Sequence, residues 1–157
     1  MKHWLPLPPR EPRPRRRIPL FHPVPVGPRH DGWTIERQAR FIGMLAQTRS
    51  VIAAARAVGM GRESAYRLRK RPGAAGFAAA WDAALGRERE TVHLDRAKST
   101  GLPAGYRQAV GLVQVVMHAG RYRDFARKPD DSALLQHLAH LDRACRRIDA
   151  AGESHSS

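Results

Sequence analysis

Two short segments with helical apolar spacing meet at one glycine, and this junction restricts the fold more than any other feature of the chain. Residues 51–58 follow Ser50, a residue type that caps helices, and residues 61–71 end before Pro72. Gly59 can adopt the positive φ of a sharp corner, and Ala55 is small enough for two backbones to approach. The apolar residues that such a corner buries are present at Ala54, Val58, Met60, Ala65 and Leu68. We therefore expect two short helices that cross steeply at Gly59.

The second of these helices is predicted to have one packing face and one basic face. On a helical wheel Gly61, Ala65 and Leu68 lie together, and the polar residues spread over the opposite side. This pattern is typical of a helix-turn-helix, whose second helix enters the major groove of DNA. An ordinary helical corner with a solvated basic face is the alternative interpretation.

Arginine is the residue that most often reads guanine, because its planar fork can bridge O6 and N7. We therefore expect Arg62 and Arg67 to read bases, and Glu63 either to accept from cytosine N4 or to restrain an arginine. The residues expected to hold phosphates are Tyr66, Arg69, Lys70 and Arg71.

Positive charge is concentrated toward the start of the chain. The 157 residues carry a formal net charge of +14, which favours a polyanionic partner. Residues 1–30 hold nine prolines, six arginines and one lysine, so we expect a disordered, extended basic arm there. Its arginines Arg13, Arg15, Arg16 and Arg17 could follow an adjacent minor groove; a nonspecific, solubilising tail is the alternative.

The remaining pattern predicts a mainly α fold. Thr34 can cap a helix over residues 35–47, and a fourth helix over 74–90 would bury Phe77, Trp81 and Leu85. Residues 99–106 are predicted to be a loop. Residues 110–117 could form a strand that turns at 119–120 into 122–125. After Pro129, Asp130 or Asp131 can cap a last helix that runs to residue 149.

These elements predict five parts of the chain. They are a disordered arm over 1–30, a helix-turn-helix domain over 31–96, a linker over 97–129 with the hairpin left open, a C-terminal helix over 130–150, and a disordered tail over 151–157.

The last helix has an apolar stripe with alternating steps of four and three residues: Leu134, Leu138, Leu141, Cys145 and Ile148. Either the helix lies on the helical core, or the stripe is the seam of a homodimer or higher homo-oligomer. Both interpretations stay open at this point.

No arrangement of residues indicates catalysis. The single cysteine, Cys145, excludes an intrachain disulfide or a cysteine-based zinc site, and His137 with His140 is best explained as a polar helix face. We expect no metal, no cofactor, no enzymatic activity and no membrane span, and a location in the cytoplasm at the bacterial nucleoid.

Residues 33–38, 50–60 and 63–69 resemble the phage small-terminase-like helix-turn-helix proteins of bacterial genomes, and the similarity covers residues 31–90. It is weaker over 110–138, where Arg121, Tyr122 and Arg123 replace a valine-glycine step. The resemblance implies double-stranded DNA binding through the helix over 61–71. We expect a sequence-specific regulator-like or domesticated-phage protein; a terminase small subunit that recognises DNA for packaging, and a nonspecific nucleic-acid-coating or RNA-binding protein, are the alternatives.

Overall fold

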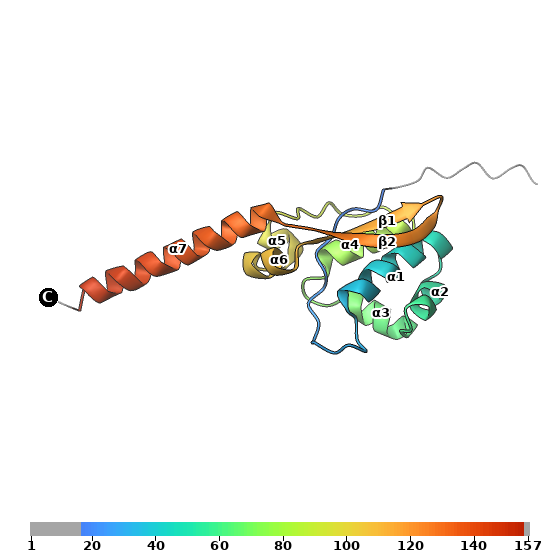
Figure 1. Cartoon of the computed structure of the whole chain (residues 1–157), viewed down its shortest axis with the longest axis horizontal. Coiled ribbons are helices and arrows are strands. Elements are labelled where there is room, and N and C mark those ends of the chain that lie inside the picture. The colour runs from blue at the N-terminus through green and yellow to red at the C-terminus, as the bar shows by residue number, and fades with distance from the viewer. Residues whose placement is uncertain (1–16, 156–157) are drawn as a thin grey trace, which may run out of the picture.

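The computed structural model describes residues 17–155, and its first three helices form the predicted bundle (Figure 1). These helices are α1 (Ile35–Thr48), α2 (Val51–Ala57) and α3 (Arg62–Arg69). Both predicted caps are confirmed: Thr34 Oγ1 accepts from the Arg37 N–H at 3.3 Å, and Ser50 Oγ accepts from the Ala53 N–H at 3.2 Å. The expectation of a mainly helical fold is also confirmed.

The corner between α2 and α3 has the expected geometry. Gly59 has φ +70°, a conformation that L side chains rarely adopt, and the Met60 N–H donates to the Ala55 carbonyl at 2.9 Å. The five apolar residues around the corner are buried or half-buried. The predicted steep corner is therefore present.

An aromatic core joins α1 to α4 (Ala75–Ala84). The Phe41 ring lies 5.0 Å from that of Trp81 and 6.1 Å from that of Phe77, between ring centroids. Trp33 contacts Phe41 edge-on at 5.4 Å. The bundle is thus built around large rings contributed by residues on both sides of the corner.

α4 is shorter than predicted, because a glycine ends it. Gly86 has φ +71°, its N–H donates to the Ala83 carbonyl, and the Arg87 N–H donates to the Asp82 carbonyl. These two bonds form a Schellman motif, which ends a helix directly before its C-cap residue and the glycine. The prediction of a helix to residue 90 is wrong for this reason, and Leu85 is only half-buried.

The expected loop over 99–106 is wrong except at residues 101–103, and the expected linker over 97–129 contains helices as well as the hairpin that was left open. Two short helices, α5 (Ala97–Thr100) and α6 (Ala104–Val110), occupy this region. Arg107 of α6 is fully buried and donates to the carbonyls of Leu102 and Leu94 and to Gln136 Oε1. A buried guanidinium with these acceptors holds the segment together through contacts that local sequence does not encode.

A hairpin covers one side of the bundle. Strands β1 (Leu112–His118) and β2 (Arg121–Lys128) pair antiparallel, and Ala119 and Gly120 turn between them with φ +50° and +77°. The predicted strand and its turn are confirmed. The register shifts between Val116 and Met117, so one extra residue bulges from β2.

Part of the expected disordered arm is ordered and buried. Phe21 is fully buried and exchanges both backbone hydrogen bonds with Val113 of β1. The Gln38 side chain accepts from the Val24 N–H and donates to the Val24 carbonyl, so it fixes the chain like a strand partner. The prediction of disorder up to residue 30 is wrong over residues 18–26, and the folded unit begins well before residue 31; residues 1–16 lie outside the described part.

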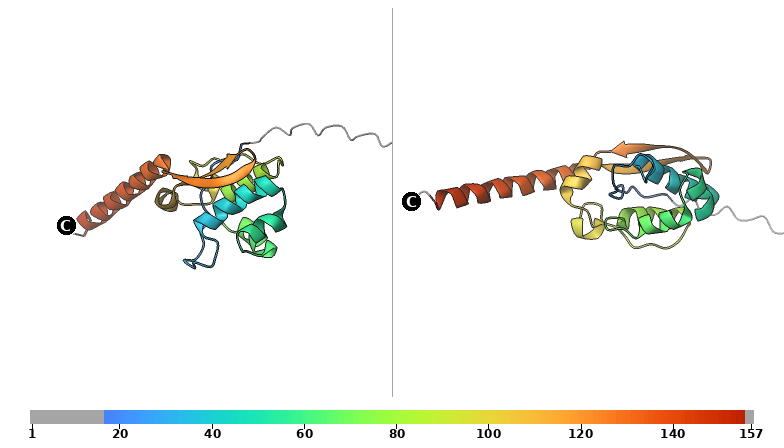
Figure 2. Two further views of the ribbon diagram at one scale, coloured as in Figure 1. Left: turned by 45° about the vertical axis from the view of Figure 1, so that its right-hand side comes forward. Right: turned by 90° about the horizontal axis from the view of Figure 1, so that it is seen from below.

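The last helix, α7 (Asp131–Glu153), projects away from the body (Figures 1 and 2). Asp130 caps it by accepting from the Ala133 N–H at 2.9 Å, and the other Asp130 oxygen contacts the buried His22 Nε2 at 2.6 Å. Ala133 is the one buried residue of α7. The helix therefore does not lie on the core, and it includes residues 151–153 that were expected in the tail.

Candidate nucleic-acid interface

α3 separates into a packed face and an exposed face, as predicted. Ala65 is 0% and Leu68 is 2% exposed, and both lie in the core of the bundle. The exposed residues of α3 and its C-cap are Arg62, Glu63, Tyr66, Arg67 and Lys70. Arg71, one residue later, is also exposed. The basic side chains expected to read DNA are therefore on the accessible side.

Tyr66 supports Arg62. The Tyr66 ring is tilted against the ring of the buried Trp81, with 5.2 Å between the ring centroids. The Arg62 guanidinium carbon lies 5.6 Å from the centroid of the Tyr66 ring. A cation over an aromatic face is attracted by its quadrupole, which restricts the arginine to a narrower set of directions. Tyr66 thus connects an exposed arginine to the rigid core.

Arg69 stands apart from the other basic residues of α3. Its guanidinium forms two 3.0 Å contacts with the Asp82 carboxylate and lies 5.2 Å from the centre of the Trp81 ring. The side chain is 27% exposed. A cation held by a carboxylate in this fork geometry joins α3 to α4, so it is not available for a phosphate in this conformation.

A further clamp on α3 comes from a residue that sequence reasoning did not assign to the site. Trp33, just before α1, donates its Nε1–H to Ser64 Oγ at 2.7 Å. Ser64 is a polar residue that lies between the packing and the exposed faces of α3. This position was the feature of the sequence from which a hydrogen bond to a neighbouring element could have been predicted. The Trp33–Ser64 hydrogen bond and the Arg69–Asp82 ion pair therefore hold α3 on two of its sides.

Four cations of this face have no ionic partner. Within residues 17–155, Arg62, Arg67, Lys70 and Arg71 form no ion pair, and Glu63 forms none with any arginine. Restraint of an arginine by Glu63 is therefore not observed. The face carries unneutralised positive charge, with Glu63 as its acidic residue on α3.

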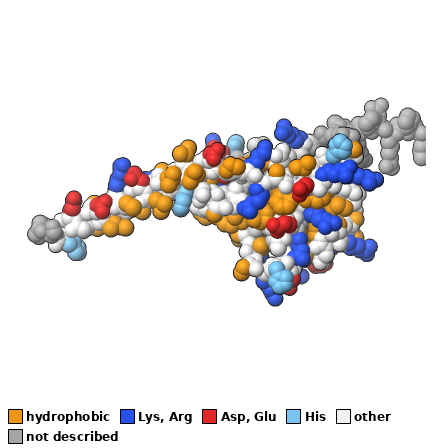
Figure 3. Space-filling model, in the orientation of Figure 1, with side chains coloured by type: hydrophobic (Ala, Val, Ile, Leu, Met, Phe, Trp, Pro, Cys, Tyr) orange, Lys and Arg blue, Asp and Glu red, His pale blue; other side chains and the backbone are white. Residues whose placement is uncertain are grey.

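The loop before α1 extends to the same side of the molecule as α3 (Figures 1 and 2). It contains Arg29 and His30, both exposed, and Arg37 of α1 braces it by donating to the carbonyls of His30 and Gly32. Arg29 lies 3.8 Å from the Asp31 carboxylate of the same loop, so the loop extends the exposed polar surface beside α3 without adding net positive charge. Figure 3 shows further Lys and Arg side chains on the part of the body formed by the helical bundle and the hairpin.

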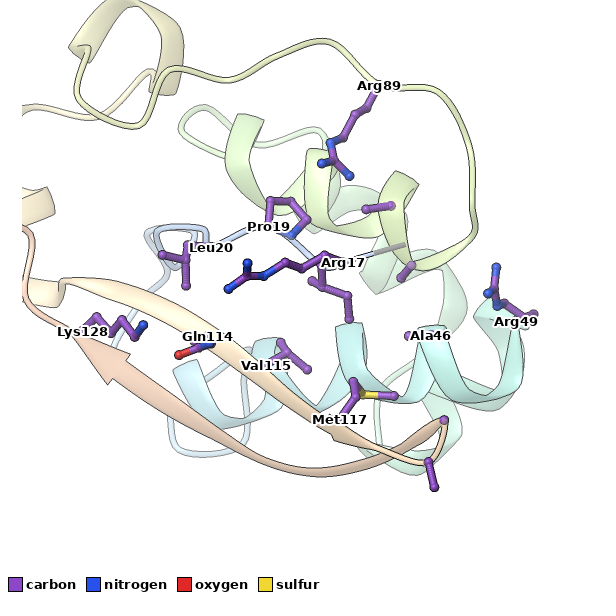
Figure 4. A pocket seen from close by; sticks show the side chains of 15 residues that line it. Arg17, Pro19, Leu20, Ala46, Arg49, Arg89, Gln114, Val115, Met117 and Lys128 are labelled. Carbon is purple, nitrogen blue, oxygen red and sulfur yellow. The ribbon is translucent and has the colours of Figure 1, made fainter. Parts of the chain in front are cut away.

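The proline-rich arm enters the fold elsewhere. Arg17 lines a cavity beside the hairpin (Figure 4), and the structure does not bring it together with the exposed face of α3. Arg13, Arg15 and Arg16 lie outside the described residues.

Over the described range, no three His, Cys, Asp or Glu side chains gather as a metal site requires. Nor does any helix there combine the length and the apolar composition needed to cross a membrane. His137, one of the two histidines considered above, packs its ring against Gly105 of α6.

Comparison of the chain with family models, with curated proteins and with solved structures gives no match.

Proposed function

We propose that the protein binds double-stranded DNA sequence-specifically, with α3 in the major groove. One observation carries the proposal: α3 is clamped by Trp33 and Arg69 while Arg67 and Lys70 extend to solvent without a partner. A rigid helix that presents unpaired guanidinium and ammonium groups loses little side-chain and backbone freedom on meeting an anionic groove. An ordinary helical corner whose basic face only contacts solvent would not need contacts on two sides to hold α3 in place.

Each residue has a distinct role in this proposal. Arg67 and Arg62 read base edges, with Tyr66 directing Arg62. Lys70 and Arg71 contact phosphates, and Arg69 positions α3 without touching DNA.

The decisive experiment begins with selection of bound fragments from a random duplex library. On the recovered sequence Arg67→Ala should lose about 1–3 kcal/mol of binding free energy, with little loss on random duplex. Lys70→Ala is the matched control: it should weaken both duplexes alike and reduce the salt slope by about 0.9.

Equal losses on both duplexes for Arg67→Ala would assign the protein to the nucleic-acid-coating class. Stronger competition by RNA than by duplex DNA would assign it to RNA binding. Either result contradicts the proposal.

The biological setting proposed is a regulator-like or domesticated-phage protein at the bacterial nucleoid. It follows from the resemblance of residues 31–90, and packaging of phage DNA is the alternative. Mapping of bound chromosomal sites separates the two: sites upstream of genes favour regulation, and one site within a phage genome favours packaging.

We further propose that α7 pairs two copies of the chain in parallel. Its stripe is exposed: Leu138 is 52%, Leu141 49% and Ile148 71% accessible (Figure 3). With Leu134 and Cys145 these residues fill alternating a and d positions of a heptad repeat, the seam of a coiled coil.

The charges of α7 favour a second copy in the parallel orientation. The three arginines Arg143, Arg146 and Arg147 fall on outer heptad positions, away from the seam. Asp142 and Asp149 fall on one edge of it. In a parallel pair this edge faces His137, Ala144 and Ala151, whereas an antiparallel pair would align the carboxylates of both copies.

Cys145, the chain's single cysteine, tests the orientation directly. A parallel pair in register brings the two Cys145 residues within disulfide reach, whereas the nearest antiparallel register separates them by about 10 Å. Mild oxidation of dilute protein should therefore give a covalent dimer. Leu141→Asp should abolish it and Ala139→Asp, which adds the same charge on the outer side, should not. Equal cross-linking of both variants would mean random collision and contradict the pairing.

A further inference from the structure

A cavity of about 560 Å³ lies between the hairpin and the helices. Its walls come from residues 17–20, the ends of α1 and α4, and β1 (Figure 4). The hairpin and α3 lie on opposite sides of α1 (Figures 1 and 2). A ligand in this cavity and DNA on α3 would therefore not compete for the same surface.

Short side chains keep the cavity open. Alanines stand at positions 46, 83 and 84, where α1 and α4 face the hairpin, and larger apolar side chains complete the wall: Ile18, Leu20, Val115 and Met117. Protein interiors are normally packed to the density of organic crystals. Space of this size between apolar walls accommodates an apolar group the size of a small ligand.

The charged residues of the lining are all basic. Arg17, Arg89 and Lys128 surround the cavity, Arg49 lies at its far end directly after α1, and no Asp or Glu is among the lining residues (Figure 4). Within residues 17–155 none of these four side chains forms an ion pair. All four side chains are exposed, so they stand at the rim of the cavity, where together they give its mouth a positive potential that dissolved salt partly screens.

Position divides the cavity into two ends. Lys128 and Gln114 lie side by side on the hairpin at one end, and the Arg17 guanidinium extends toward the same end from the opposite wall, beside Leu20, whereas Met117 and Ala46 lie nearer the end of α1 (Figure 4). The first end offers two cations and an amide to an anionic group, and the second offers an apolar surface. The two ends are complementary to a molecule that has an acidic head and an apolar body.

We propose that this cavity binds a small amphiphilic anion, with its acidic group at Arg17, Gln114 and Lys128 and its apolar body between α1, α4 and β1. The proposal is independent of DNA binding by α3.

Fluorescence titration of the full chain with anilinonaphthalene sulfonate tests it, with N-phenylnaphthylamine as the uncharged counterpart. The sulfonate should bind saturably at one site, and Arg17→Ala or Lys128→Ala should each weaken it roughly three- to tenfold. Neither variant should change binding of the uncharged dye. Decanoate should displace the sulfonate, and decanol, with the same tail, should not.

Variants outside the cavity are the controls. Arg147→Ala removes an exposed cation of α7, and Leu138→Ala removes part of its exposed apolar stripe; both should leave the titration unchanged. Ala46→Leu should narrow the apolar end of the cavity and weaken probe binding, with near-ultraviolet circular dichroism verifying that this variant is folded.

Three results would overturn the proposal. They are equal affinity for the charged and the uncharged dye, an unchanged affinity for the probe in folded Ala46→Leu, and loss of the probe in Leu138→Ala. Displacement of the probe by duplex DNA in place of decanoate would assign the cations to nucleic acid and would also overturn it.

Discussion

Replacement of Gly43 by alanine tests whether the hairpin packs on α1 as described. Gly43 is a buried position of α1, directly beneath the Tyr122 ring of β2. A methyl group built there would approach Tyr122 Cγ to 2.7 Å and overlap nearer ring atoms. These atoms belong to the ring itself, so the whole Tyr122 side chain would have to turn away or the hairpin would have to move.

Two opposing effects determine the outcome. In an unobstructed helix, Gly→Ala stabilises by about 1 kcal/mol, because glycine loses more backbone freedom on folding. Overpacking a filled interface costs about 1–3 kcal/mol. Gly43→Ala should therefore lower the free energy of unfolding by up to about 2 kcal/mol. In a Tyr122→Ala background, where the ring is absent, the same change should raise it by about 0.5–1 kcal/mol.

Urea unfolding followed by circular dichroism measures all four members of this double-mutant cycle. The sign reversal is the diagnostic result, since each single variant alone could destabilise for other reasons. A gain of about 1 kcal/mol in both backgrounds would refute the close contact between Tyr122 and α1.

Further predictions concern the buried histidine and the two clamps on α3. Burial, the larger effect, lowers the pKa of His22 below its ordinary 6.5, although Asp130 partly opposes it. As the pH drops, the histidine of the unfolded chain therefore takes up a proton before that of the folded chain. The free energy of unfolding should fall below about pH 6.5, by up to about 1.4 kcal/mol per pH unit. In urea titrations at several pH values, His22→Gln should flatten this dependence. Asp82→Ala should destabilise by about 1–2 kcal/mol by leaving the half-buried Arg69 unpaired, whereas the same change with Arg69→Met already present should cost much less. Ser64→Ala should cost about 1 kcal/mol, because the Trp33 N–H loses its acceptor, and a full cost in a Trp33→Phe background would contradict that bond.

The elements predicted correctly are those whose signals lie within a few residues. Thr34 and Ser50 cap helices with their own side chains, and Gly59 turns the corner by its own conformation. The Schellman ending at Gly86 was also a local signal, which the predicted helix over residues 74–90 passed over. The candidate DNA-reading face was predictable for the same reason, since the wheel of a short helix places Ala65 and Leu68 opposite Arg67.

Contacts between residues far apart in the sequence explain the predictions that were wrong. Proline density indicated an open arm, but Phe21 pairs with Val113 and Val24 pairs with the Gln38 side chain, both across large sequence separations. Composition indicated a loop before the hairpin, but a buried Arg107 finds carbonyl acceptors there. Tertiary contacts of this kind override local propensity, because an apolar or polar group that is satisfied in the core outweighs a few tenths of a kcal/mol of backbone preference.

The sequence by itself determined the helical corner, the split of α3 into packed and exposed faces, and the heptad stripe of α7, because helical periodicity relates residues three and four apart. Only the tertiary structure decided which arginines remain free. Arg69 and Arg67 are two residues apart on one short helix, yet Asp82 neutralises the first and nothing in the described chain approaches the second as an ionic partner. The same holds for the stripe of α7, whose exposure follows from the direction in which the buried His22 and Asp130 anchor the start of the helix. Charge in a sequence can be counted residue by residue, but its availability depends on what the fold brings within a few ångströms.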